Sequence, residues 1–492
     1  MFYINRKCKG ERKSEYSNGV RHNNKRASIT VMMSLLIAVI IGFIMIMTEH
    51  VRILGLNHRL TEAADSAMDS LFSMYDSELF EEFGLMLLNI DKLEDNKDPK
   101  IVLREYLILN LNSRKNNLFM SGNLYNGEDS TAEIEDMVFV TENEGELFAR
   151  SVLEFMKYRT IGVALDTVNG QLNDVKVGEE TKKEADEDLK ERLSAVDDDK
   201  KSEYEEVVKE SWIDKIEQIR TQGWLSFVMP FEQAASSYIV DDINLPSRWR
   251  TTNLTWYHSA VSEMEENLLF NEYLMEHCRS FSFAKAAKGM SYEIEYILNG
   301  GVSDKENLKM TVNSMLILRE MMNLMSAIKS PVLSEQAETA ASALVGWTGI
   351  YPVVKVTQMA MLTGWSFAEA IIDVRTLLGG GRIPLIKSEE NWELSIDQMA
   401  DFIEKDNRMI AENEEGLVYD DYLRLLLYML DRNDRRYRTM DVIQLRMKEK
   451  NLEFLMEDCV GAIQAEFNMK ASPLFYCFGS RYRFLYRQSR MY

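Results

Sequence analysis

The 21 residues from Ser28 to Thr48 carry no charge, and no other feature constrains the chain as strongly. Their sequence, SITVMMSLLIAVIIGFIMIMT, would form a helix about 31 Å long at ~1.5 Å per residue, which matches the hydrocarbon core of a bilayer. A cleaved signal peptide has a shorter apolar region of about 7–15 residues, followed by a cleavage site of small residues. Here the run is longer, and residues 49–52 contain no such site. The sequence therefore predicts a permanent anchor with one span.

The residues before this segment are strongly basic. Residues 1–27 contain eight Lys and Arg residues and two acidic residues, a net charge of +6. The 20 residues after the segment contain two Arg among three acidic residues. Because Lys and Arg accumulate on the cytoplasmic side of a span, we expect the tail in the cytoplasm and the bulk of the chain outside it.

A second uncharged stretch, Thr339–Val354, is 16 residues long and is followed by Lys355. It is short for a membrane crossing, and Pro352 interrupts it. We interpret it as a buried helix pair or loop, so the expected number of spans stays at one.

The chain beyond the anchor is acidic. The formal net charge of the whole chain is −22, so residues 49–492 carry −28. Nucleic-acid binding depends on Lys and Arg that neutralise phosphates, so this charge argues against a nucleic-acid partner. It also argues against an anionic membrane surface as a ligand of the exterior.

Directly beyond the anchor, apolar residues recur about every 3.5 residues. They are Ile53, Leu56, Leu60, Ala64, Ala67, Leu71 and Met74. Acidic residues fall on the other side, so the pattern predicts an amphipathic helix that continues the anchor to about residue 76, over roughly 70 Å in all. This stripe packs either against its own domain or, as a stalk, against copies of itself or related subunits, and the spacing favours neither. The seven residues are the candidate partner-packing site.

The rest of the chain predicts an α+β protein that is mainly α. The expected order is a basic tail (1–27), the anchor (28–48), the stalk helix (49–76), a mixed α+β region (77–178), a charged insert or linker (179–210), a short strand-containing segment (211–254) and a mostly helical domain (255–492).

Local signals place some elements within these regions. Thr141 with Glu144, and Ser303 with Glu306, have the spacing of capping boxes and predict that helices begin there. The strand-like stretches are 137–140 and 223–230. Further helices are expected over 367–375, 419–430 and 440–455.

The sequence shows no motif for chemistry. Of the five histidines, His258 and His277 lie beyond the stalk, and neither has a partner at the spacing of a metal site or a catalytic triad. We therefore predict no catalytic residue, no metal site and no cofactor, and interpret the protein as a non-enzyme. A disulfide between Cys459 and Cys477 stays open as an alternative to free thiols.

The N-terminal region resembles that of the TadE/TadG-type pseudopilin-like proteins that accompany tight-adherence pili. The resemblance lies in a basic lead, an apolar helix that opens with SITV at residues 28–31, Arg52 beyond it, and the run LTEAADSA at residues 60–67. Substrates of the prepilin peptidase carry Gly before the cleavage point and Glu five residues later, where this chain has Ala27 and Met32. This departure favours a permanent anchor over processing.

The rest of the chain is similar to a large uncharacterised family of anaerobic Gram-positive bacteria that joins such an N-terminus to a long extracytoplasmic region. The similar stretches are Ala67–Ser70 with Tyr75 and Asp76, Glu82–Leu85, Glu295–Leu298 with Gly300, Ser303, Asn307 and Leu308, Arg319 with Asn323, Trp365, Ala368–Ala370, Asp373–Arg375, Leu377, Leu378, Gly380, Pro384, Trp392, Tyr419–Leu423, Arg438, Met440 and Asp441. The family has no assigned activity, so the resemblance implies a cell-envelope role and no catalytic residues.

Together these features favour a membrane-anchored extracytoplasmic component of a tight-adherence-type pilus or a related secretion system, with a structural or assembly role. Its expected partners are the lipid bilayer and pilus or secretion subunits, or another copy, packed along the stalk. A surface-anchored binding protein for a cell-wall polymer or a protein is the alternative. An anchored enzyme is the third possibility.

Overall fold

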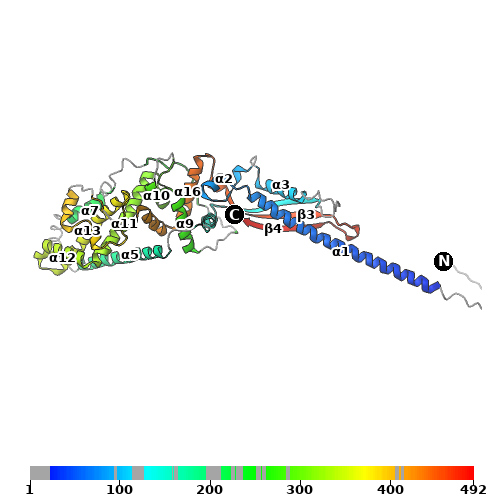
Figure 1. The fold of residues 1–492 in the computed structure, drawn as a ribbon, viewed down its shortest axis with the longest axis horizontal. Coiled ribbons are helices and arrows are strands. Elements are labelled where there is room, and N and C mark those ends of the chain that lie inside the picture. Colours follow the sequence, from blue (N-terminus) through cyan, green and yellow to red (C-terminus); the bar gives the residue numbers. More distant parts are fainter. Residues whose placement is uncertain are drawn as a thin grey trace, which may run out of the picture. The chain divides into compact units, whose positions relative to one another are not determined.

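The computed structural model describes residues 23–93, 97–112, 127–157, 159, 165–194, 212–222, 228, 236–250, 256, 262–283, 289–404, 409–411 and 415–492. Over these residues the chain is α+β and mainly α, as the sequence predicts (Figure 1). The tail before residue 23, the second half of the charged insert, and the strand-like stretch 223–230 apart from Val228 lie outside the described residues.

The helices are α1 (Asn23–Phe72), α2 (Ser77–Phe83), α3 (Pro99–Asn112), α4 (Glu146–Met156), α5 (Leu165–Ser194), α7 (Trp212–Gln222), α9 (Glu263–His277), α10 (Glu293–Asn299), α11 (Asp304–Lys329), α12 (Pro331–Val345), α13 (Tyr351–Leu378), α14 (Met399–Glu404), α15 (Tyr419–Met429) and α16 (Arg432–Lys448). The strands are β1 (Leu88–Asn89), β2 (Asp129–Phe139), β3 (Cys459–Ala471) and β4 (Tyr482–Met491). They form one sheet in which β3 pairs with the other three strands.

The predicted long N-terminal helix is confirmed: α1 is continuous over 50 residues, which is about 75 Å at ~1.5 Å per residue. Gly55 lies within it and does not interrupt it. Side chains of the uncharged segment are exposed, for example Val39 at 71% and Phe43 at 62%. Among the described residues, α1 is the one helix that is long and apolar enough to cross a membrane, judged by length and composition.

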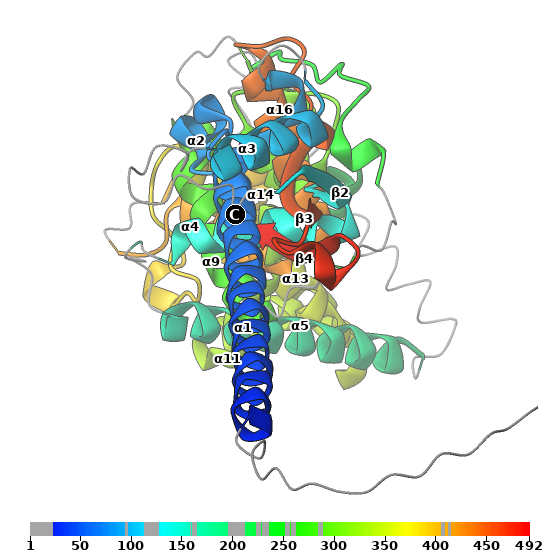
Figure 2. The ribbon, with the colours of Figure 1, turned by 90° about the vertical axis from the view of Figure 1, so that its right-hand side faces the viewer.

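The chain folds into two compact units. Unit 1 consists of residues 1–71, 100–133 and 465–488, so it contains most of α1, α3 and parts of β2, β3 and β4. Within unit 1, α1 lies beside β3 and β4 (Figures 1 and 2). The Tyr486 hydroxyl donates to the Asp65 carboxylate over 3.1 Å, and the Arg59 guanidinium donates to the Leu111 carbonyl. The second half of α1 is thereby fixed to segments that are distant in sequence.

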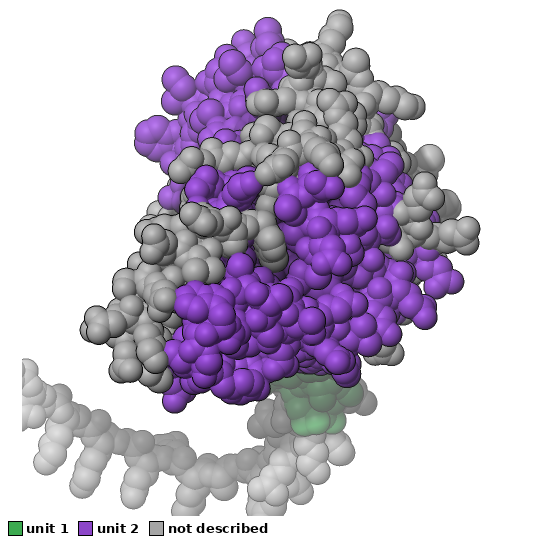
Figure 3. All heavy atoms as spheres, turned by 90° about the vertical axis from the view of Figure 1, so that its left-hand side faces the viewer, with its two compact units in different colours: residues 1–71, 100–133, 465–488 green, residues 72–99, 134–464, 489–492 purple. Residues whose placement is uncertain are grey.

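Unit 2, purple in Figure 3, consists of residues 72–99, 134–464 and 489–492, and its described residues are mostly helical. Its core is built on α11 and α13, which lie side by side. Leu308, Val312, Met315 and Met322 recur on one face of α11, and all four are completely buried. Burying a side chain of this size stabilises a fold by about 1.5–3 kcal/mol, which explains why this apolar periodicity determines the packing.

The two predicted capping boxes have different outcomes. At Ser303 the hydroxyl accepts from the Glu306 amide over 3.3 Å, and α11 begins there as predicted. The box at Thr141 and Glu144 is wrong. Glu144 has a φ of 56°, outside the helical range, and α4 begins two residues later, after Gly145, without a side-chain cap. The Arg436 guanidinium donates to the Glu144 carbonyl, so a tertiary contact fixes this turn instead.

The uncharged stretch Thr339–Val354 forms a helix pair, as predicted, but most of its residues are not buried, contrary to the prediction. It covers the end of α12, a short turn and the start of α13. Val345 and Val353 are buried, while Trp347 and Tyr351 at the turn are 60% and 62% exposed. The stretch is therefore the end of a helical hairpin within unit 2.

The division into units differs from the predicted linear order of domains. The region after residue 255 is mostly helical, as predicted. It ends, however, in the strands β3 and β4, which the sequence analysis does not predict. Residues 465–488 belong to unit 1 with α1, and the described first half of the charged insert is part of α5 in unit 2. The helix expected over 440–455 is α16, which begins and ends earlier.

Candidate functional site

The histidines and cysteines do not form a reactive centre in the described part of the chain. No group of three or more His, Cys, Asp or Glu side chains there is arranged to hold a metal ion. The His277 ring stacks on the Tyr273 ring, with 4.5 Å between centroids, and burial lowers the pKa of His277. Cys278 and Cys459 are buried, Cys477 is exposed, and all three are free thiols. His258 lies outside the described residues.

The predicted partner-packing residues lie along α1 and just beyond it, and most are covered by the chain itself. Leu56, Leu60, Ala64, Ala67 and Leu71 are all 0% exposed. Ile53 and Met74 are half-buried. Of the two alternatives that the spacing left open, this burial favours packing within the protein itself.

Several residues that carry the resemblance to the uncharacterised family meet in the interior of unit 2. Arg319 and Asn323 come from α11, Glu369 and Asp373 come from α13, and Lys387 comes from the segment after α13. The side chains of Arg319, Glu369, Asp373 and Lys387 are completely buried. We call these five residues the buried ionic network.

Two cations and two anions balance each other in this network. The Arg319 Nε donates to Asp373 Oδ2 over 3.0 Å, and the Lys387 Nζ donates to Asp373 Oδ1 over 2.7 Å and also to Glu369. Asn323 bridges the network, because it accepts from Arg319 over 2.8 Å and donates to Asp373 over 2.8 Å. The charged atoms are thus paired in a region without solvent access.

Backbone groups and aromatic side chains complete the surroundings of the network. The Arg319 Nη1 donates to the Leu385 carbonyl over 2.8 Å and to the Tyr422 hydroxyl over 3.0 Å. Glu369 accepts from the Leu394 amide over 3.0 Å, and the Trp365 indole donates to the Leu394 carbonyl over 2.7 Å. The network therefore ties α11, α13, α15 and the segment 383–394 together.

The electrostatics of the two carboxylates differ. Burial raises the pKa of Glu369, although Lys387 opposes this. Burial acts in the same direction on Asp373, but Arg319 and Lys387 outweigh it and lower the pKa of that carboxyl. A closed, neutral and paired arrangement can specify one packing of the helices, and it gives a substrate no access to its charged atoms.

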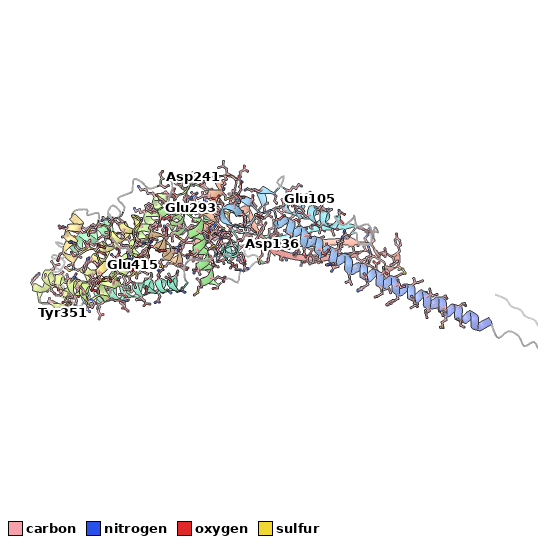
Figure 4. The ribbon with its side chains drawn as sticks, in the orientation of Figure 1. Glu105, Asp136, Asp241, Glu293, Tyr351 and Glu415 are labelled. Carbon is pink, nitrogen blue, oxygen red and sulfur yellow. The ribbon has the colours of Figure 1, made fainter. Side chains whose placement is uncertain are left out.

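A second polar cluster surrounds α10, which also lies in unit 2; Figure 4 labels Glu293 there. The Tyr296 hydroxyl donates to Asp441 over 2.8 Å, and the Tyr419 hydroxyl donates to Glu295 over 2.8 Å. Glu293 and Glu295 are 0% exposed, and each has one carboxylate oxygen without a hydrogen-bond partner. We call Glu293, Glu295 and Asp441 the α10 carboxyl cluster.

The α10 carboxyl cluster differs from the buried ionic network because burial outweighs its cationic partners. Glu293 pairs with Arg446 over 3.5 Å and with Arg279 over 3.9 Å, yet its pKa is still raised. Burial raises the pKa of Glu293 and of Glu295 to about 7, and it raises the pKa of Asp441 to about 6. The cluster therefore takes up protons near neutral pH, far above the usual range of these groups.

The sequence predicts part of the buried ionic network. Arg319 with Asn323 and Glu369 with Asp373 are each four residues apart, a spacing that places both side chains on one helical face. The sequence does not predict the burial of Lys387, because nothing local distinguishes this residue from other lysines. The buried ionic network depends on the contact between α11 and α13, and sequence spacing does not show which helices meet.

An open pocket of about 520 Å³ lies between residues 238–244 and the end of α16. The Lys448 Nζ donates to Asp242 over 2.6 Å, and the Gln444 amide donates to the same carboxylate over 3.2 Å. Burial would raise the pKa of Asp242, but the contact with Lys448 outweighs it, so the pKa is lowered. This pairing keeps Asp242 ionised and leaves it unsuited to act as a base near neutral pH.

Gly300 offers a test of how tightly the end of α10 is packed. Its φ is +67°, and a Cβ built there would meet the Arg438 Nε at 2.8 Å. We expect Gly300→Ala to lower the free energy of unfolding by about 2 kcal/mol, from backbone strain together with displacement of Arg438. Gly349 has the same φ but open space around it, so Gly349→Ala should cost only about 1 kcal/mol. Equal urea midpoints for the two variants would contradict the role of Arg438.

The comparisons with known proteins bear on unit 2. Residues 202–471 match a family described as a family of unknown function, DUF5702. The match covers more than half of the chain and includes the buried ionic network and the α10 carboxyl cluster, whereas α1 lies outside it. No curated protein and no solved structure matches the chain. The chain therefore belongs to the DUF5702 family of unknown function.

Proposed function

We propose that the protein is a membrane-anchored extracytoplasmic component of a tight-adherence-type pilus or a related secretion system, with a structural or assembly role. The observation that carries this proposal is the form of α1. One continuous helix joins an uncharged, largely exposed segment to a half that is fixed within unit 1. The helix has no break between its two halves. A partner that binds the first half of α1 is therefore rigidly connected to unit 1.

The resemblance of the N-terminal region to TadE/TadG-type proteins supports the same proposal. In this reading residues 28–48 span the cell membrane, the basic tail lies in the cytoplasm, and both units lie outside. The buried ionic network, whose charged atoms are closed to solvent, fits a structural role within unit 2.

The surface for lateral partners lies on the exposed side of α1. Val51 and Leu54 are 55% and 56% exposed, and they follow Met47 at helical spacing, so the apolar surface of the anchor continues past Thr48 on this side. Exposed apolar side chains at this position fit a partner that is itself anchored alongside α1. Pilus or secretion subunits, or a second copy, are the partners that we propose.

Cross-linking from α1 tests this proposal. In a background with Cys8→Ser and Cys477→Ser, Leu54→Cys should capture pilus-type subunits or another copy in native membranes. Leu60→Cys is the matched control, because Leu60 lies on the same helix and is completely buried. An impermeant maleimide should label Leu54→Cys in intact cells if the proposed orientation holds. Monomeric behaviour with no captured subunit would contradict the proposal.

A surface-anchored binding protein is the second candidate. It is favoured by Trp347 and Tyr351, which present exposed aromatic rings at the end of the α12–α13 hairpin; Figure 4 labels Tyr351. Aromatic rings of this kind serve as contacts for polymers and proteins. Wall binding by the purified protein that is lost in a Trp347→Ala variant, with no pilus component present, would favour this candidate.

A further inference from the structure

The turn between β3 and β4 lies against α1 where the uncharged segment ends. Its Leu474 amide donates to the Glu49 carboxylate, over 3.2 Å to Oε2 and 3.4 Å to Oε1. Glu49 is the residue after Thr48, and it is 3% exposed and paired with Arg52 over 3.1 Å. All of these residues belong to unit 1, and Figure 1 shows the turn beside α1. The turn is therefore held at the height at which the apolar segment stops.

The composition of this turn differs from that of the rest of the exterior. Residues 474–478 read LFYCF; Leu474 is 40% exposed and Tyr476 is fully exposed. Phe475 and Phe478 are half-buried and pack edge to face, with 6.1 Å between ring centroids. A turn in water gains nothing from a fully exposed tyrosine next to an exposed leucine, so these side chains indicate a surface that covers them.

The segment that forms the turn and β4 has a charge of the opposite sign to that of the whole chain. Residues 472–492 contain four Arg and no acidic residue, in a chain whose net charge is −22. Next to the turn, the Arg481 side chain is 67% exposed although it pairs with Glu128. An exposed arginine next to exposed aromatic residues matches lipid phosphates above an apolar layer.

We propose that the β3–β4 turn, residues 472–481, is a second membrane contact that lies in the headgroup layer of the bilayer spanned by α1. The proposal rests on the proposed anchoring, because α1 brings the turn to that height. Tyrosine and phenylalanine rings favour the interface between headgroups and acyl chains, and Arg481 faces the phosphates. The hydrogen bond from Leu474 to Glu49 sets the depth, so the turn and the anchor together fix how unit 1 stands on the membrane.

Cys477 allows a direct test, because it is exposed within the turn while Cys278 and Cys459 are buried. In a Cys8→Ser background, the full-length protein would be labelled at Cys477 with an environment-sensitive fluorophore and placed in lipid nanodiscs that contain phosphatidylglycerol. Lipids with a nitroxide on the headgroup or near the top of the acyl chain would serve as quenchers. We expect Cys477 to be quenched at least about fivefold more strongly than a label that lies outside the interfacial layer.

Two further label positions make the outcomes distinguishable, each in a background that also carries Cys477→Ser. Ser66→Cys is exposed on α1 itself and lies 17 residues beyond Glu49, about 26 Å farther from the membrane. Ile37→Cys lies in the middle of the uncharged segment and should be quenched by nitroxides deep in the acyl chains. Equal quenching at Cys477 and Ser66→Cys, with Ile37→Cys strongly quenched, would overturn the second contact and leave the anchor intact.

Two other results would also overturn the proposal. If Ile37→Cys is not quenched, the anchoring on which it rests fails. If the label at Cys477 is shielded to a degree that rises with protein concentration and not with lipid, a second copy covers the turn.

Replacing both Leu474 and Tyr476 with serine should reduce the quenching at Cys477 severalfold and leave the quenching at Ile37→Cys unchanged, as expected for a contact that depends on those side chains.

Discussion

Replacing Arg319 with methionine is expected to lower the free energy of unfolding by about 3–5 kcal/mol, the range for removing one partner of a buried ion pair. The guanidinium is completely buried and donates to Asp373, Asn323 and two backbone carbonyls. Methionine fills part of the volume, but Glu369 and Asp373 would then share Lys387 as their one cation in the buried ionic network. Urea unfolding of the full-length protein in detergent, followed by circular dichroism, measures the loss.

Arg424→Met is the matched control for this variant. The Arg424 side chain is 25% exposed and pairs with Glu272 and Asp421, so its loss should cost less than about 1 kcal/mol. Combining Arg319→Met with Asp373→Asn restores the charge balance, and we expect the double variant to lose about 1–3 kcal/mol less than the sum of the single variants. If Arg319→Met costs no more than Arg424→Met, the buried ionic network does not hold the helices together.

Acidification from pH 8 to pH 5 is expected to stabilise the protein through the α10 carboxyl cluster. The pKa of Glu293 and of Glu295 is raised to about 7, and that of Asp441 to about 6, because burial disfavours the charged forms. The unfolded chain releases these protons near pH 4, so the stabilisation is complete below that pH and is lost as the pH rises through 6 and 7. Each glutamate contributes up to about 3 kcal/mol.

Other groups act in the opposite sense and limit the effect, among them His277 and Asp373. Burial lowers the pKa of His277, so that residue favours the unfolded state as the pH falls below about 6.5. The pKa of Asp373 is lowered, so its contribution is lost only at more acidic pH. The melting temperature should therefore rise between pH 8 and pH 5 and fall again in stronger acid.

The variant Glu295→Gln separates the cluster from other titrating groups. It keeps an acceptor for Tyr419 and removes the charge, so it should stabilise the protein at pH 8 and reduce the pH dependence of the melting temperature. Glu390→Gln, at an exposed position, should leave that dependence as in the original protein. A melting temperature that falls steadily from pH 8 to pH 5 would refute the role of the cluster.

Much of the helical fold could be predicted because its signals are local. The uncharged segment and the stripe beyond it predicted α1, and the cap at Ser303 with the apolar face after it predicted α11. The turn at Glu144 was predicted incorrectly because a distant arginine holds a conformation that the local sequence does not favour. Local signals thus identified elements reliably where no tertiary contact opposed them.

The strands at the end of the chain show the limit of such reasoning. In β3 the residues Ile463, Ala465 and Phe467 are buried and alternate with half-buried polar ones, a pattern with the period of a strand. The sequence therefore carries a signal for the strand itself. It carries no signal for what the strand packs against, because β4 and the turn before it contact α1, which lies more than 400 residues earlier in the chain. The overall acidity also pointed away from membrane surfaces, while residues 472–492 reverse that charge locally.

The assembly of unit 1 from distant segments has a consequence for biosynthesis. The contact between Glu49 and Leu474 joins residues 425 positions apart, so at about 5–20 residues per second the ribosome needs roughly 20–85 s to deliver the second after the first. During that time the stripe of α1 has emerged while β4 has not been made. The nascent chain must therefore keep Leu60 and its neighbours out of aggregates for most of its translation.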